Sequence, residues 1–225
     1  MVAQTISDQY AMTMDEILKT FLLVYAGLFP IVNPIGAAPI FFGLTRLCTN
    51  EQRNKLALRV TINSFLMLLG SLFAGSYVLE FFGITLPIVR LAGGFVVTAA
   101  AWNLLQAGND DSRGDHEPKP PTDAFYPLTM PLTVGPGSIA VAITLGSQRP
   151  RGNIADMTVL GGSAIAGLIA VAATIYLCYR FAEGTVGALG EEGTDAVVRL
   201  SGFILLCIGF QIIWSGYTAL PRIAG

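Results

Sequence analysis

Two stretches decide the fold of this chain: FPIVNPIGAAP at residues 29–39 and YPLTMPLTVGP at residues 126–136. Each contains three prolines, and all three recur at an offset of 97 residues. A proline inside a helix removes a backbone donor and clashes with the preceding turn, so clustered prolines break a helix rather than bend it. Both stretches lie within long apolar windows. Each is therefore predicted to be a membrane span that is interrupted midway by proline and glycine.

Six windows of the 225-residue chain are long and apolar enough to cross a bilayer. They hold 140 residues with only two charges, Arg90 and Arg199, whereas the other 26 charges fall in the remaining 85 residues. A helix needs roughly 20 apolar residues to span a hydrocarbon core of about 30 Å. The windows are 21–44, 60–79, 84–107, 124–147, 157–179 and 196–220. We predict an all-α membrane protein with six transmembrane helices, since continuous apolar runs disfavour a β-barrel.

A second similarity favours an internal repeat. The sequence VRLAG at 89–93 opens the third window and resembles VRLSG at 198–202, which opens the sixth, at an offset of 109. Each half contains three spans, an odd number, so the second half must cross the membrane upside down relative to the first. We predict two inverted three-helix repeats, residues 1–107 and 124–225, joined by an acidic, proline-containing linker at 108–123.

Composition excludes several classes of function. The net charge is −2 and no basic stripe is present, so nucleic acid is not expected as a partner. The three cysteines form no CxxC pair and are interpreted as small apolar residues, with no metal site or cofactor predicted. The partner that the spans require is the lipid bilayer. A homo-oligomer is compatible with the sequence, which does not set the oligomeric state.

The distribution of basic residues predicts the orientation of the spans, because Lys and Arg favour cytoplasmic loops. The first, third and fifth loops carry Arg46, Arg53, Lys55, Arg59, Arg113, Lys119 and Arg180, and the opposite side carries Lys19, Arg149, Arg151 and Arg222. The side with seven basic residues is predicted to be cytoplasmic and the side with four to lie outside, so both termini are expected outside the cytoplasm.

The broken spans are the predicted binding site. A half-helix that restarts after a break points unpaired N–H groups and a positive dipole end at mid-membrane, where a carboxylate binds well. We expect the helices to restart near 36–39 and 135–138. The carbonyls near Val32 and Thr129, which end the preceding halves, are expected to face a cation or an ammonium group. The predicted substrate-binding residues are Asn33, Pro34, Gly36, Pro39, Thr129, Thr133, Gly135, Pro136, Gly137 and Ser138. The alternative is that the prolines only shape packing hairpins and the polar side chains bond their own backbone.

Four further polar residues in the spans are candidates for lining the cavity. A charged side chain is costly near hydrocarbon, so Arg90 and Arg199 are expected to have a function. Each is predicted either to contact substrate or to extend to the membrane interface, since both lie close to a span start. Asn103 and Gln211 line the cavity or hold helices together by hydrogen bonds.

The NPIG element at 33–36 and the GPGS element at 135–138, joined by an acidic linker, resemble the MarC/SnatA family of bacterial and archaeal inner-membrane proteins. The similarity covers essentially the whole chain. It implies six spans in the plasma membrane and, for the SnatA branch, transport of small neutral amino acids such as glycine and alanine. Family members often have Asp where this sequence has Asn33, so a titratable carboxylate is missing there.

These observations favour a secondary transporter of a small zwitterion that works by alternating access between the halves. The alternative is an exporter or channel for another small metabolite. Coupling to H⁺ or Na⁺, or uncoupled exchange, stays open because no window contains Asp or Glu.

An enzyme is not expected. Ser138 would be the nucleophile of an intramembrane hydrolase, but a serine needs a base within hydrogen-bond reach. The single histidine, His116, belongs to the predicted linker, and no lysine occurs in any window.

Overall fold

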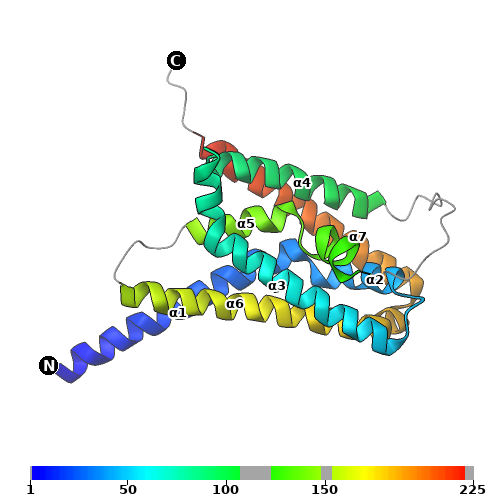
Figure 1. The fold of residues 1–225 in the computed structure, drawn as a ribbon, viewed down its shortest axis with the longest axis horizontal. Coiled ribbons are helices and arrows are strands. Elements are labelled where there is room, and N and C mark those ends of the chain that lie inside the picture. Colours follow the sequence, from blue (N-terminus) through cyan, green and yellow to red (C-terminus); the bar gives the residue numbers. More distant parts are fainter. Residues whose placement is uncertain (1, 107–122, 148–153, 221–225) are drawn as a thin grey trace, which may run out of the picture.

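A computed structural model describes residues 2–106, 123–147 and 154–220 (Figure 1), so most of the predicted linker, with His116, lies outside the described residues. Every element in these ranges is helical, which confirms the predicted all-α class. The elements are α1 (Val2–Val32), α2 (Pro34–Leu44), α3 (Asn50–Phe81), α4 (Leu86–Gln106), η1 (Ala124–Thr133), α5 (Pro136–Ser147), α6 (Ile154–Arg180) and α7 (Ala182–Thr218).

Four helices, α3, α4, α6 and α7, are each long and apolar enough to cross a membrane. Two further pairs meet the same test only together, and each pair is bent at a short break. The bend is 42° between α1, counted from Met14, and α2, and it is 68° between η1 and α5. The described residues therefore contain four candidate spans, or six if each bent pair is one span, and the predicted breaks in the first and fourth windows are present.

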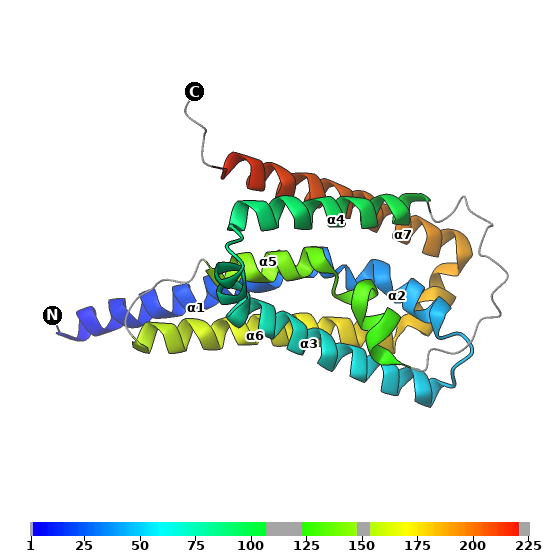
Figure 2. The same cartoon turned by 45° about the horizontal axis from the view of Figure 1, so that its top comes forward.

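The chain runs back and forth along the long axis of the molecule (Figures 1 and 2). The beginning of α1 and the end of α7 lie at one end, here called the termini end, and the end of α4 and the beginning of η1 lie at the other, the linker end. Along this axis α1–α2 runs opposite to η1–α5, α3 opposite to α6, and α4 opposite to α7.

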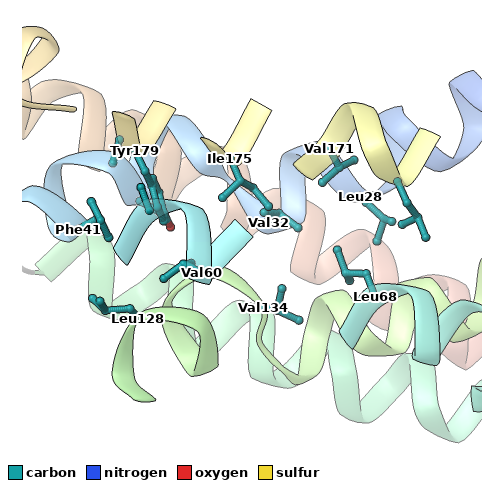
Figure 3. Packing of buried hydrophobic residues seen from close by; sticks show 14 of the residues in the cluster. Leu28, Val32, Phe41, Val60, Leu68, Leu128, Val134, Val171, Ile175 and Tyr179 are labelled. Carbon is teal, nitrogen blue, oxygen red and sulfur yellow. The ribbon is translucent and has the colours of Figure 1, made fainter. Parts of the chain in front are cut away.

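One large apolar core joins α1, α2, α3, α5, α6 and η1. Its most completely buried large side chains include Phe41 and Tyr179, whose rings stack with centroids 4.4 Å apart (Figure 3). A second, smaller cluster of Val97, Ala101 and Leu205 belongs to α4 and α7. The helices thus form two packing units, and their boundary becomes important for the site.

Glycines bring α4 and α7 into backbone contact along their length. Gly202, Gly209 and Gly216 follow one another at intervals of seven residues on α7. A Cβ atom at each would lie within about 3.3 Å of α4 backbone atoms, such as the Ala101 carbonyl oxygen and the Pro87 carbonyl oxygen. Small residues at a helix interface permit this approach, and dispersion contacts then hold the pair together in lipid.

The outer faces of the same two helices carry large apolar side chains. Examples are Phe95 on α4 and Phe203, Phe210 and Trp214 on α7, all more than half exposed. A soluble monomer rarely exposes so continuous an apolar surface. These faces fit contact with lipid acyl chains.

Arg53 connects three elements at the linker end. It is 7% exposed, and its guanidinium forms a 2.6 Å ion pair with Glu183 at the start of α7 and lies 4.8 Å from the centre of the Phe42 ring on α2. It also donates to the carbonyl oxygens of Thr45 and Cys48 at 3.5 and 3.4 Å. From the sequence, Arg53 was predicted only as a loop charge, because a partner 130 residues away cannot be identified from a local pattern.

Replacing Arg53 with methionine is expected to lower the free energy of unfolding by about 2–3 kcal/mol, because charge-assisted bonds to buried carbonyls are lost. Glu183→Gln should cost less, since Arg53 keeps its carbonyl acceptors. Lys55→Met is the matched control, because Lys55 and Glu51 form a fully exposed pair worth little. Denaturant titration of the detergent-solubilised protein measures all three, and equal effects of R53M and K55M would contradict the assignment.

Candidate functional site

The first break is made by a single residue in the left-handed region. Asn33 has φ 48° and ψ 54° and separates α1 from α2, and its side-chain Oδ1 accepts a hydrogen bond from the Gly36 N–H at 3.2 Å. Its own carbonyl accepts from Ala37 N at 2.9 Å. Asparagine tolerates this conformation better than most residues and is a strong N-cap. Pro34 follows at the first helical position, where its missing N–H costs nothing.

The second break is built from a repeated tetrapeptide. The sequence YPLT at 126–129 is followed at once by MPLT at 130–133, and each threonine hydroxyl donates to a carbonyl five residues earlier. Thr129 Oγ1 bonds the Ala124 carbonyl at 2.8 Å, and Thr133 Oγ1 bonds the Leu128 carbonyl at 2.7 Å. The two prolines lack N–H donors and interrupt the regular backbone bonds of this segment, and the two hydroxyls add side-chain bonds to its carbonyls. This short repeat was not among the sequence predictions, although it is visible in the sequence.

The new helix α5 begins at Pro136 with its first N–H groups unoccupied. Ser138 Oγ donates to the Gly135 carbonyl at 2.9 Å, and Ile139 N donates to the same carbonyl at 3.1 Å. Within the described part of the chain, the N–H groups of Gly137 and Ser138 have no hydrogen-bond partner. They are the donors that a helix N-terminus offers to an anionic group.

The helices restart at Pro34 and Pro136, which are 102 residues apart, whereas the prolines recur at 97. Because α2 begins at Pro34, the predicted restart near 36–39 lies two residues too far along the chain. The preceding half continues to Thr133, and the Thr129 carbonyl accepts the Val134 N–H at 2.8 Å, so its role toward a cation stays a prediction. Tyr126 and Met130 within η1 have extended backbone angles, so the chain passes two prolines before the regular helix α5 begins.

A cavity of about 320 Å³ lies where the two breaks meet the α4–α7 pair. It is lined by residues of α1, α2, α4, α5, α7 and the second break. Its lining residues are Ile31, Val32, Asn33, Ala37, Ile40, Val96, Val97, Ala100, Asn103, Leu104, Pro131, Leu132, Thr133, Gly135, Gly137, Ser138 and Leu205. The cavity thus occupies the boundary between the two packing units.

The structure gathers half of the predicted binding residues at this cavity. Those that line it are Asn33, Thr133, Gly135, Gly137 and Ser138, together with the secondary candidate Asn103. Pro34, Gly36, Pro39, Thr129 and Pro136 do not line it. Gly36 instead faces α7, where an added Cβ would lie 2.6 Å from Ser201 Cβ, and Thr129 is completely buried. These residues shape the breaks, and the roles of the lining residues in binding stay a prediction.

Comparison with known proteins identifies the family. The model of a protein family described as "MarC family integral membrane protein" matches residues 18–220. The chain is 30% identical over 213 residues to the inner membrane protein MarC of Salmonella typhimurium and to that of Escherichia coli, covering 90% of this chain and 96% of each relative. This chain belongs to the MarC family. No solved structure matches it.

The cavity of this MarC-family protein contains no carboxylate among the side chains that line it. The N-terminal ends of α2 and α5 contribute partial positive charge there, and the C-terminal end of α1 at Val32 contributes partial negative charge. Asn33, Asn103 and the hydroxyl groups of Thr133 and Ser138 are the polar side chains there. The site is therefore suited to an anionic group held by backbone donors, next to apolar walls.

Thr133 has a second hydrogen bond that holds the break against α6. Its Oγ1 lies 2.7 Å from the hydroxyl oxygen of Tyr179, which is completely buried. The remaining sequence candidates lie elsewhere in the MarC fold. Arg90 and Gln211 line a separate cavity at the termini end, and Arg199 is exposed and lines neither.

Asn33→Ala is expected to destabilise the protein by about 1–2 kcal/mol, because it removes the N-cap acceptor and places a Cβ without that bond in the left-handed region. Asn33→Gly should cost only a few tenths of a kcal/mol, since glycine adopts φ 48° without strain. Denaturant titrations of the two variants measure the difference. If both cost the same, the backbone conformation is not what selects asparagine.

Proposed function

We propose that this MarC-family protein is a secondary transporter of a small zwitterion, with neutral amino acids of the glycine and alanine class as the first substrates to test. The observation that carries the proposal is the convergence of two discontinuous spans on one cavity, with the Gly137 and Ser138 N–H groups available at its edge. Irregular backbone at membrane depth is tolerated where it lines a cavity, and transporters place substrate sites there.

The size of the cavity supports a small substrate. Its volume of about 320 Å³ is at the lower end of small-molecule sites, which occupy about 300–1,000 Å³. The carboxylate of an amino acid would accept hydrogen bonds from the start of α5, and Asn33 and Thr133 offer oxygen acceptors to its ammonium group. Apolar side chains such as Val96 and Leu205 favour a substrate with little or no side chain. The resemblance to the SnatA branch points to the same class.

We infer that transport uses two inverted repeats. Contacts between helices come in matched pairs, which supports this inference: α3 packs on η1 and α5 as α6 packs on α1 and α2, and α4 packs on α5 as α7 packs on α2. Val96 and Leu205 both line the cavity and are 109 residues apart, the offset between the two VRL sequences. Alternating access would then be a movement of the α4–α7 pair against the larger core, which opens the cavity to each side in turn.

Coupling through a buried carboxylate is not part of this proposal, because the cavity lining holds no Asp or Glu. Sodium bound by carbonyl oxygens, protons carried by another route, and uncoupled exchange are distinguished by measuring flux with imposed sodium or pH gradients. Catalysis is not proposed either, since Ser138 Oγ donates to the Gly135 carbonyl and no base is described near it.

The proposal is tested by flux of labelled glycine and alanine into vesicles that contain the purified protein. Saturable, stereoselective uptake is expected, and flux equal to that of empty vesicles across a panel of neutral amino acids would overturn the proposal. Flux that does not saturate would favour the alternative, a channel, and saturable flux of a different metabolite would favour an exporter of that compound.

Both termini are proposed to lie outside the cytoplasm, since seven basic residues flank the linker-end loops and four flank the termini end. When a reporter that works only in the periplasm is fused after Gly225, we expect to detect its activity. A reporter active only in the cytoplasm should be silent, and the opposite result would reverse the orientation.

A further inference from the structure

A second cavity of about 260 Å³ is lined by residues near the start of α4, in the second half of α5 and near the end of α7, which puts it toward the termini end. It is lined by Arg90, Val141, Thr144, Gln211, Ile212 and Ser215. On α4 and α5, the close contact of Gly93 with Ala140 falls between the residues that line this cavity and those that line the central one. The two cavities are thus separate places in the fold.

Arg90 brings a permanent positive charge to this cavity, because a guanidinium stays protonated in proteins. It is half-buried, and among the side chains that the structure describes no carboxylate lies within ion-pair distance, 4.0 Å, of it. A buried or partly buried charge without a partner is costly. An anion in the cavity would offset this cost.

Thr144 supplies an independent observation. Its Oγ1 is buried and has no hydrogen-bond partner within the described chain. Other hydroxyl groups in these helices bond the carbonyl four residues earlier, as those of Ser71, Ser147, Ser163 and Thr174 do at 2.7 to 2.8 Å. Thr144 does not form this bond, so its hydroxyl has no partner in the described chain, and the residue lines the cavity.

We propose that this cavity binds an oxyanion group, a carboxylate or a phosphate, held by the Arg90 guanidinium, the Thr144 hydroxyl and the Gln211 amide. Arginine and hydroxyl donors together match the planar or tetrahedral oxygens of such groups. The group belongs either to a small solute at the termini side or to the headgroup of an anionic lipid. This inference goes beyond transport and does not depend on it.

Acetate and methylammonium are the probes for a solute, because they separate the carboxylate from the ammonium group. The thermal midpoint of the purified protein is measured against sodium acetate, sodium chloride and methylammonium chloride at matched ionic strength. Acetate is expected to raise the midpoint beyond chloride and methylammonium. In Arg90→Gln the apparent Kd for acetate should rise about tenfold or more, as for loss of a charge-assisted bond, and in Arg199→Gln it should not change.

Thr144→Val gives a second test that does not depend on whether R90Q folds. Valine has nearly the same shape and removes a buried hydroxyl that has no partner, so the ligand-free midpoint should stay the same or rise. The apparent Kd for acetate should nevertheless rise severalfold. A hydroxyl with a merely structural role would leave acetate binding unchanged.

Lipid is tested by native mass spectrometry of the same variants with phosphatidylglycerol and phosphatidylcholine. Selective retention of phosphatidylglycerol that R90Q and T144V both lose, without an acetate effect, would assign the oxyanion to a lipid headgroup. An acetate effect lost in both variants would assign it to a solute. Acetate and phosphatidylglycerol binding that neither variant alters would overturn the proposal, whatever the outcome of the flux measurements.

Discussion

Gly209→Val is expected to destabilise the protein by about 3 kcal/mol or more, the upper part of the range for overpacked cores. A Cβ at this position would collide with Thr98 Oγ1 and lie 2.9 Å from the Thr98 backbone nitrogen and 3.1 Å from its Cα. The backbone cannot rotate away as a flexible side chain can, so α4 and α7 must separate. Because dispersion contacts hold helices together in lipid, separation loses stability along the whole pair.

Unfolding in denaturant, followed by the loss of a single size-exclusion peak, measures this effect. The control is Gly70→Val on α3, where nothing lies within 4 Å of an added Cβ. Gly70→Val should change stability by about 0.5 kcal/mol or less, as surface substitutions do. Equal losses in the two variants would mean that intolerance of valine in helices, rather than the α4–α7 contact, determines the result.

Gly137→Ala is expected to reduce substrate flux by about 10- to 100-fold, the scale associated with a displacement of about 1 Å at a site. An added Cβ would overlap Val97 Cγ2 and lie 3.3 Å from the Gly93 carbonyl oxygen. The Val97 side chain lines the cavity, so it must move into the cavity or α5 must shift. Either change disturbs the Gly137 and Ser138 N–H groups that the proposed site uses.

A compensating variant makes this prediction specific. Val97→Ala removes the atom that the new methyl group would meet, so the double variant Gly137→Ala with Val97→Ala should regain flux relative to Gly137→Ala alone. Gly161→Ala is the control, since an added Cβ there meets nothing within 4 Å. It should keep full flux and gain slight stability from better helix propensity. If the double variant is as inactive as Gly137→Ala alone, the contact with Val97 is not the cause of the lost flux.

The helical class and the two interruptions could be predicted from the sequence, because both depend on local chemistry. A charge-free run of more than twenty residues has few stable forms other than a membrane helix, and a proline removes its donor wherever it stands. The predicted restart near 135–138 agrees with the start of α5 at Pro136, but the restart of α2 at Pro34 could not be predicted from proline spacing. That restart depends on the left-handed conformation of Asn33, which ends α1 and caps α2.

Half of the predicted binding residues line the central cavity, and packing decided which ones do so. The predicted residues were polar residues, prolines and glycines near the breaks, yet Thr129 is completely buried and Gly36 faces α7, whereas Pro131, which was not predicted, lines the cavity. The walls contributed by Val96, Val97 and Leu205 carry no local signal, because apolar residues on a membrane helix look alike whichever face they occupy. Arg90 and Arg199 show the same limit: they share the sequence VRL, but one lines a cavity and the other is exposed.

What the sequence determined by itself is therefore where the chain enters the membrane, where its helices must break, and that charge is absent from the breaks. These properties follow from transfer free energies and from backbone donors, which belong to each residue. Tertiary structure alone decided that the two breaks meet at one cavity, that glycines at intervals of seven bring α4 against α7, and that Arg53 pairs with Glu183. Those outcomes depend on distances between residues far apart in the chain, which only the packing of the helices fixes.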